Sequence, residues 1–137
     1  MKLLPASLLL VACMFNRPVY AVNFNVLPIA YQQGTEPERL MNLFLKAVQT
    51  SNENEVKKFI SENYSARFLE IPMAAHLKVI NNLHKDFAHL IVAQTIKNGT
   101  KITAIIKSPV NKSKRITIET DQNIPAKILI VDLKDEN

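Results

Sequence analysis

The sequence predicts an α+β protein, in which N-terminal helices pack on one face of a curved antiparallel sheet of about four strands. The first half of the chain carries apolar residues at helical spacing, and the second half holds four short segments rich in β-branched residues. Helices that precede strands along the chain are typical of α+β proteins. A length of 137 residues and a hydrophobic content of 47% fit one globular domain.

Residues 1–21 are predicted to be a signal peptide. Lys2 gives the start a positive charge, residues 8–15 form an apolar run, and Ala21 ends a short stretch that a signal peptidase can read. The apolar run is too short to span a bilayer as a stable helix. We therefore expect an exported protein, periplasmic or secreted.

Cys13 offers an alternative end to this segment. Residues 10–13 resemble a bacterial lipobox, in which the thiol is acylated and anchors the protein to a membrane. Cleavage after Ala21 is the preferred interpretation, and it leaves a mature chain without cysteine and therefore without thiol chemistry. Residues 22–34 would then form an extended arm in front of the domain.

The first helix is expected to begin after Thr35. Thr35 and Glu38 have the spacing of a capping box, and Pro37 suits a first turn because its missing N–H would be unpaired there. The apolar residues that share one face of this helix are Leu40, Leu43, Phe44, Ala47 and Val48.

Two further helices are expected before the strands. Asn52 and Glu55 repeat the capping pattern, and the buried stripe that follows is Val56, Phe59, Ile60 and Tyr64. Pro72 opens a third helix that runs to about residue 85, with Leu77, Ile80 and Leu83 or His84 directed inward. Such short helices need a partner surface to be stable.

Four strands are predicted to supply that surface, at residues 88–96, 101–107, 115–120 and 126–133. Asn98-Gly99 favours a hairpin turn, and the short connections favour antiparallel neighbours. The positions expected to face the helices are Ile102, Ala104, Ile106, Ile116, Ile118, Ile128 and Ile130. The domain thus spans residues 35–133, and residues 134–137 form a polar tail.

Part of the helical region resembles a known family. Residues 44–48, Asn52-Glu53, Phe59 and residues 65–69 resemble the small domain that accompanies secreted β-lactamase-related serine hydrolases. That domain belongs to the nuclear transport factor two-like (cystatin-like) superfamily, so the resemblance implies helices packed into a curved sheet to form a cone. No Ser-x-x-Lys or Gly-x-Ser-x-Gly motif is present to supply a serine nucleophile.

The resemblance also implies a candidate enzyme site, because ketosteroid isomerases of this superfamily transfer protons inside the cone. Such chemistry needs a carboxylate with a raised pKa in an apolar pocket and a hydrogen-bond donor opposite. The side chains most able to take these roles are Tyr64, His76 and Asp86, with Glu70.

No metal or other cofactor is expected. His76 and His84 lie on the same predicted helix, and eight residues along a helix separate them by about 12 Å, too far for one ion. His84 with Asp86 or His89 lacks the further ligands that would complete a shell.

Residues 87–118 contain basic residues and no acidic ones. The basic residues proposed for binding are Lys107, Lys112, Lys114 and Arg115, which suit anionic lipids or envelope polymers; protection of exposed strand edges is the alternative. Nucleic acid is not expected, because the net charge is only +3 without Lys2 and Arg17 and no aromatic residues are interleaved with the lysines.

The leading functional hypothesis is an exported, non-catalytic domain that binds a protein partner or a small apolar ligand at the mouth of the cone. The alternatives are a small isomerase- or hydratase-like enzyme and a binder of anionic envelope surfaces. A homodimer is a further option that the sequence does not decide.

Overall fold

The computed structural model describes residues 34–136. The predicted signal peptide, Cys13 and residues 22–33 of the predicted arm lie outside the described residues, as does residue 137. The described part begins with the helices α2 (Glu36–Gln49) and α3 (Glu53–Asn63), a short 3₁₀ helix η2 (Phe68–Glu70) and the helix α4 (Met73–Phe87).

The capping residues expected from the sequence hold the first two helices. The Thr35 N–H donates to Glu38 Oε2 at 2.7 Å, which is one half of a capping box. The Asn52 side chain accepts from the N–H groups of Asn54 and Glu55, so two of the free donors at the start of α3 are satisfied. Both helices therefore begin where the sequence predicts.

Four antiparallel strands follow: β1 (Ile91–Asn98), β2 (Lys101–Lys107), β3 (Ser113–Thr120) and β4 (Ile128–Asp135). They lie side by side in chain order, so β1 and β4 are the two edges of the sheet. Gly99 takes a positive φ of 59° in the turn between β1 and β2, as expected of an Asn-Gly hairpin. The structure thus confirms the α+β fold of helices packed on an antiparallel sheet.

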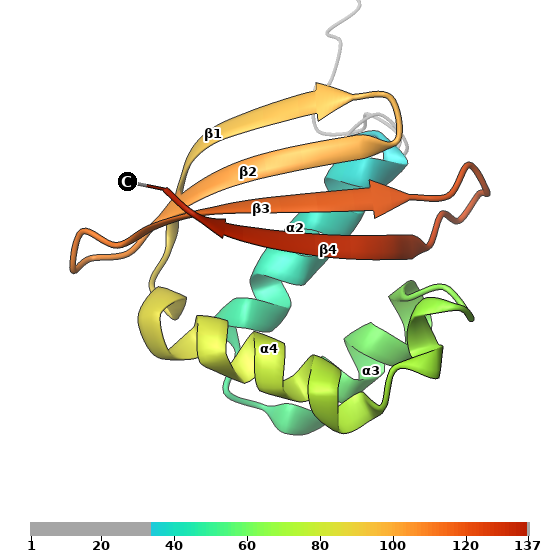
Figure 1. Ribbon diagram of the computed structural model, residues 1–137, viewed down its shortest axis with the longest axis horizontal. Coiled ribbons are helices and arrows are strands. Elements are labelled where there is room, and N and C mark those ends of the chain that lie inside the picture. The colour runs from blue at the N-terminus through green and yellow to red at the C-terminus, as the bar shows by residue number, and fades with distance from the viewer. Residues whose placement is uncertain (1–33, 137) are drawn as a thin grey trace, which may run out of the picture.

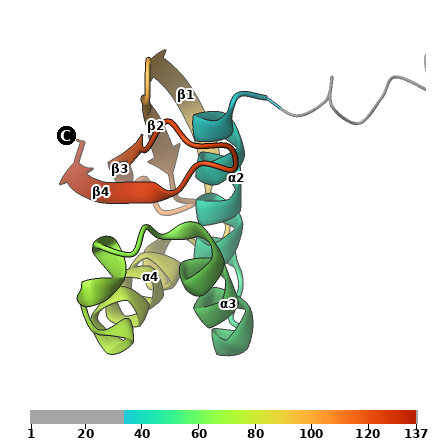
Figure 2. The same ribbon diagram turned by 90° about the vertical axis from the view of Figure 1, so that its right-hand side faces the viewer.

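The helices and the sheet meet in one apolar core. Figures 1 and 2 show α2 lying across one face of the sheet, while α3 and α4 lie beyond the β4 edge. The residues that β2, β3 and β4 contribute to the fully buried core are Ile102, Ala104, Ile106, Ile116, Ile118 and Ile128. Each large side chain buried in this way stabilises the fold by about 1.5–3 kcal/mol.

The prediction that Ile130 faces the core is wrong. Thr120 pairs with Ile128 while the preceding Glu119 pairs with Ile130, so the register shifts and Leu129 is the extra residue. Since a shift of one residue reverses which face a side chain points to, Ile130 is left on the outer face, 52% exposed.

Val131 and Leu133 take the inner positions of β4 instead. They pair with Ile118 and Ile116 and pack, half-buried, against the edge of the core. The strand also continues through Lys134 and Asp135, which were expected to belong to the tail. At the other end of the domain, β1 starts at Ile91, three residues later than expected.

Candidate binding cleft

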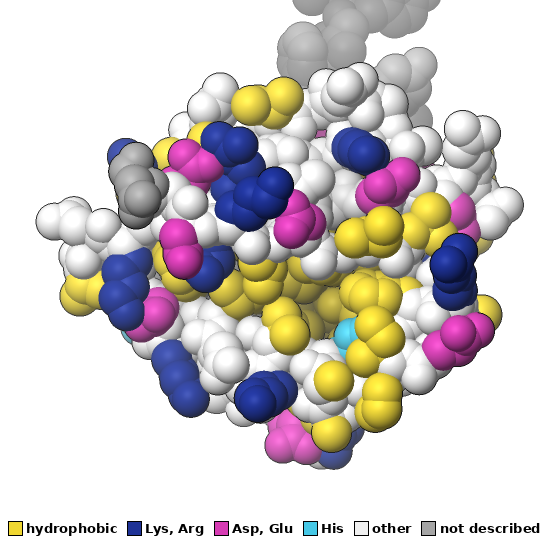
Figure 3. All heavy atoms as spheres, viewed as in Figure 1, with side chains coloured by type: hydrophobic (Ala, Val, Ile, Leu, Met, Phe, Trp, Pro, Cys, Tyr) yellow, Lys and Arg dark blue, Asp and Glu magenta, His cyan; other side chains and the backbone are white. Residues whose placement is uncertain are grey.

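An apolar cleft lies between α4 and the edge of the sheet. The helix α4 packs mainly on α2 and α3 and makes few contacts with the strands. The cleft measures about 280 Å³, and its lining residues are Val79, Asn82, Leu83, Asp86, Phe87, Lys114 and Leu133. Figure 3 shows hydrophobic side chains gathered in a hollow across the middle of this face, with charged residues around it. This hollow between α4 and β4 is named the α4–β4 cleft.

The walls of the cleft come from both layers of the fold. Leu83 and Phe87 are buried on the inner side of α4, whereas Val79 on its flank is 41% exposed. Leu133 faces them from β4 because of the register shift described above. The α4–β4 cleft therefore offers apolar surface that the domain itself does not cover.

Charged residues line one end of the α4–β4 cleft. An adjoining hollow of about 390 Å³ shares Asp86, Phe87 and Lys114 with the cleft. Lys112 Nζ lies 2.6 Å from Asp86 Oδ1, and Lys114 Nζ lies 2.8 Å from Asp135 Oδ1. The hydrogen bond and positive charge of Lys114 lower the pKa of the Asp135 carboxyl.

The basic residues proposed for binding mostly pair with carboxylates from outside the basic segment. Besides the two pairs above, Arg115 Nε lies 2.5 Å from Glu136 Oε1. Lys107, at the end of β2, is in no ion pair with another described residue. The local positive field at Lys112, Lys114 and Arg115 is therefore weaker than the sequence suggests.

An aromatic cluster lies towards the start of α4. Its five residues are Phe44, Phe59, Tyr64, Phe68 and His76. The Tyr64 ring stacks on the Phe68 ring at a centroid distance of 4.6 Å and forms a T-shaped contact with the His76 ring at a centroid distance of 4.9 Å. The Ser65 N–H donates to Ile128 O at 2.9 Å, which ties the segment after α3 to β4.

The structure brings together two of the three catalytic candidates. Tyr64 and His76 are both buried and in contact, and burial raises the pKa of the Tyr64 phenol. Asp86 lies ten residues further along α4, about 15 Å away along the helix axis, and it pairs with Lys112. Glu70 is exposed.

The bonds of His76 fit a structural role. Its Nε2 lies 3.0 Å from Phe68 O, and because a carbonyl only accepts, Nε2 must carry the proton. Among the described residues, no carboxylate forms a hydrogen bond with Tyr64 or His76. The pair therefore lacks the buried carboxylate that proton transfer within a cone requires.

The other histidines of the described part also have local explanations. His84 Nδ1 lies 2.8 Å from Val48 O, which joins α4 to the end of α2, and His89 is exposed. Residues 34–136 contain no group of three or more potential metal-ligating side chains.

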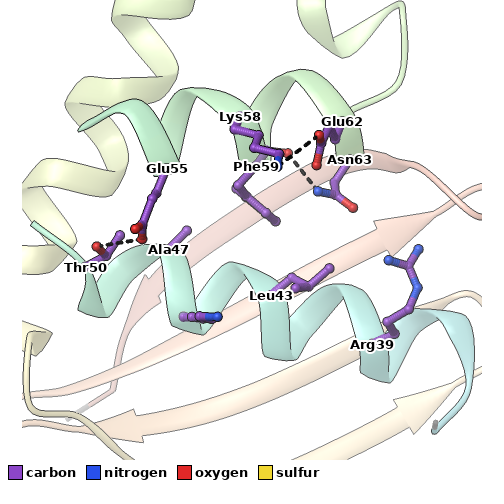
Figure 4. A pocket seen from close by; sticks show the side chains of 10 residues that line it. Arg39, Leu43, Ala47, Thr50, Glu55, Lys58, Phe59, Glu62 and Asn63 are labelled. Carbon is purple, nitrogen blue, oxygen red and sulfur yellow. Dashed lines mark hydrogen bonds and ion pairs between the residues drawn. The ribbon is translucent and has the colours of Figure 1, made fainter. Parts of the chain in front are cut away.

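A second groove, which the sequence did not indicate, runs between α2 and α3 (Figure 4). It measures about 390 Å³, with Leu43, Ala47 and Phe59 between the helices and charged side chains around them. Glu55 accepts from Thr50 at 3.2 Å, and the Asn63 side chain donates to Phe59 O at 2.8 Å. Glu55 and Asn63 are therefore both held by groups of α3 and of the turn before it.

The binding site expected at the mouth of a cone stays a prediction. Of the residues that line the α4–β4 cleft, the sequence had singled out Leu83, Asp86 and Lys114 but not Val79 or Leu133. Leu133 was hidden because nothing in the sequence marks the register shift in β4. Val79 stands three residues after His76 and four before Leu83, so helical spacing alone would place it with the buried stripe of α4, whereas the structure leaves it 41% exposed beside the cleft.

Comparisons with family models, with curated proteins and with solved structures find no significant match to this chain. None of the helices among residues 34–136 is long and apolar enough to cross a membrane. What the described residues define is an α+β domain, with three helices packed against an open four-stranded antiparallel sheet and an apolar cleft between α4 and β4.

Proposed function

We propose that this protein is an exported, non-catalytic binding domain of the nuclear transport factor two-like type, which holds an apolar ligand or an apolar segment of a partner in the α4–β4 cleft. The observation that carries the proposal is the apolar lining of the cleft, in which the partly exposed Val79 and Leu133 lie over the buried Leu83 and Phe87. Apolar surface that a fold leaves open in a concave place, with a few polar groups at its rim, is the usual form of a small-molecule or peptide site.

Asn82, Asp86 and Lys114 supply the polar groups at the rim. Because Asp86 and Lys114 are both engaged in ion pairs, the rim is nearly neutral and favours no strongly charged ligand. A ligand with an apolar body and a small polar end therefore fits best.

The test is a fluorescence titration of the full chain with 1-anilinonaphthalene-8-sulfonate, which brightens in apolar sites. Val79→Glu places a carboxylate on the wall of the cleft at a side chain that is already 41% exposed, so the fold should tolerate it. We expect the affinity for the probe to fall about tenfold, equivalent to about 1.4 kcal/mol.

Val110→Glu is the matched control, since Val110 is 69% exposed and lies outside the cleft. It should leave the affinity for the probe unchanged. Equal binding by the Val79→Glu chain and the unaltered chain would place the probe elsewhere and contradict the proposal.

A second candidate function, an isomerase- or hydratase-like enzyme, is favoured only by the contact between Tyr64 and His76. It predicts turnover of β,γ-unsaturated ketones or enoyl thioesters that is abolished by Tyr64→Phe. Absence of turnover by the unaltered chain across both substrate classes would leave the binding domain as the better account.

The third candidate, a binder of anionic envelope surfaces, rests on Lys107, Lys112, Lys114 and Arg115. It predicts sedimentation with phosphatidylglycerol vesicles that salt weakens and that replacing Lys112, Lys114 and Arg115 by Gln reduces. Because carboxylates already pair with these three residues, we expect little sedimentation at physiological salt and little change in the variant.

A further inference from the structure

The edge strand β4 borders the α4–β4 cleft and has almost no backbone partner on the side away from β3. It is the last strand of the sheet and forms its ladder with β3 alone. On the other side, the one backbone hydrogen bond within residues 34–136 runs from the Ser65 N–H to Ile128 O, at 2.9 Å. That contact belongs to a parallel bridge between Tyr64 and Ile128. The chain therefore begins a fifth strand beside β4 and leaves it after a single bridge.

The bulge in β4 lies next to that bridge and leaves the remainder of the edge regular. The register shifts at Leu129, whereas residues 130–135 pair one to one with residues 114–119 of β3. Six residues of a regular strand span about 20 Å, which is long enough to pair with a short extended segment.

The backbone groups of Val131 and Leu133 point away from β3. The Glu136 N–H donates to Ser113 O, so Glu136 faces β3. Alternate residues of an antiparallel strand direct their N–H and C=O groups to opposite sides, so Val131 and Leu133 face the open edge. Within residues 34–136 no other backbone group bonds to these two residues on that side. The edge therefore offers two N–H and two C=O groups in the spacing of a strand.

The charged side chains of β4 leave the cleft side of this edge apolar. Asp132 and Lys134 alternate with the inward-facing residues and lie on the outer face of the sheet, where they pair with each other at 3.5 Å. Asp135 lies at the end of the edge and pairs with Lys114. Since no charge on the cleft side is left without a partner of opposite sign, an uncharged occupant complements this surface best.

The helix α4 restricts what can reach the edge of β4. Figures 1 and 2 show α4 lying beyond this edge, and the cleft of about 280 Å³ lies between the two. A second copy of the chain would have to bring a whole sheet, with its own helices, past α4. A single extended segment needs only the spacing of about 4.8 Å between neighbouring strands. The position of α4 therefore favours an occupant that is one strand wide.

We propose that the occupant of the α4–β4 cleft is an extended segment of a partner protein, which pairs with β4 as an added strand between β4 and α4. This inference rests on the proposed function and names the chemistry of its ligand. The segment bonds to the outward N–H and C=O groups of Val131 and Leu133, and every second side chain lies against Val79 and Leu83 of α4. In strand addition, backbone hydrogen bonds give affinity and alternate side chains give specificity. The segment is therefore uncharged and apolar at every second position.

The test uses a peptide, acetyl-Thr-Val-Thr-Val-Thr-Val-Lys-amide, with a dye on the lysine, and follows its binding to the full chain by fluorescence anisotropy. Two further peptides carry backbone N-methyl groups, one on all its valines and the other on all its threonines. Each removes the donors from one edge of a strand only, because alternate residues face opposite edges. We expect one methylated peptide to bind about tenfold more weakly than the parent and the other to bind equally well. Equal binding by all three peptides would overturn the proposal.

Val131→Pro tests the same hydrogen bonds from the side of the protein. It removes an N–H that points outward, and an edge strand tolerates proline at such a position. We expect this variant to bind the parent peptide about tenfold more weakly than the unaltered chain. Val131→Ala is the matched control, because it shortens the side chain but keeps the N–H, and its affinity should change less than about threefold. Equal affinities of the two variants, both shown to be folded by circular dichroism, would contradict the proposal.

The probe 1-anilinonaphthalene-8-sulfonate separates a failure of this inference from a failure of the proposed function. If Val79→Glu weakens binding of that probe but the parent peptide does not bind at about 1 mM, the added strand is overturned and the apolar cleft stands. If Val79→Glu weakens binding of neither the probe nor the peptide, the proposed function fails, and the added strand fails with it. A dimer in gel filtration that Val131→Pro abolishes would overturn the proposal in favour of a second copy.

Discussion

His76 on α4 donates its Nε2–H to the backbone carbonyl of Phe68 on η2, at 3.0 Å. The ring also packs edge-on against Phe68 at a centroid distance of 4.8 Å and against Tyr64 at 4.9 Å. One side chain therefore joins α4, η2 and the end of α3, next to the place where this region is tied to β4.

His76→Ala should destabilise the protein by about 2 kcal/mol or more, because it leaves a gap among the rings and removes one of the two donors to the Phe68 carbonyl, the other being the Ile71 N–H. Urea unfolding followed by circular dichroism measures the change. His89→Ala is the control, since His89 is exposed and should change the free energy of unfolding by less than about 0.5 kcal/mol. Equal effects of the two substitutions would show that the buried contacts of His76 contribute nothing.

The Tyr64 phenol makes stability depend on pH in the alkaline range. Burial raises its pKa above the ordinary value of 10.0, so the folded protein keeps a proton that the unfolded chain has lost. The contribution is complete below about pH 10 and is lost as the pH rises further, by up to about 1.4 kcal/mol per pH unit.

Tyr64→Phe keeps the ring and removes the ionisable group, so the fall in stability between pH 10 and 11.5 should be shallower in the variant. Denaturant unfolding at a series of pH values measures both slopes. Identical slopes would mean that the phenol ionises as freely in the folded state as in the unfolded state.

Glu36 links the start of α2 to the loop before β4. Its carboxylate accepts from Arg39 Nη2 at 2.9 Å and from the Ala126 N–H at 2.7 Å, and these bonds, that of Arg39 first, lower its pKa. Because the pKa of Glu36 is lower in the folded protein than in the unfolded chain, its ionised carboxylate stabilises the fold at pH values above the ordinary pKa of 4.5. This stability is lost as the pH falls below 4.5 and through the pKa of the folded protein.

Glu36→Gln should therefore cost about 1–2 kcal/mol at pH 7 and reduce the loss of stability between pH 5 and 3. Glu53→Gln is the matched control, since Glu53 forms an exposed ion pair with Lys57 and should matter by less than about 0.5 kcal/mol. Thermal unfolding at pH 7 and pH 3.5 tests both variants. A Glu36→Gln chain as stable as the Glu53→Gln chain would contradict the assignment.

The pairing of β3 with β4 predicts that Ile118 and Ile130 contribute very differently to the free energy of unfolding. Ile118→Thr places a hydroxyl in the fully buried core and should cost about 2–4 kcal/mol, whereas Ile130→Thr on the outer face should cost less than about 1 kcal/mol. Chemical denaturation of the two variants decides the matter. A large loss at Ile130 would mean that this side chain faces the helices after all.

The sequence by itself determined the fold class, the starts of the helices and the bounds of β2. Helical spacing, the capping residues Thr35 and Asn52 and the Asn98-Gly99 turn are local signals, and each acts on residues only a few positions away. For the same reason the buried isoleucines of β2 and β3 followed from simple alternation.

Only the tertiary structure decided the lining of the α4–β4 cleft and the charge of its rim. A bulge in β4 depends on the pairing with β3, and it moves Leu133 inward and Ile130 outward without any local mark in the sequence. Likewise, Asp86 meets Lys112 across 26 positions of the chain, a contact that exists only once the helix and the loop have been packed together. Local interactions determine where each helix and strand forms. A binding site depends on how far apart side chains of different helices and strands lie, and only tertiary packing sets those distances.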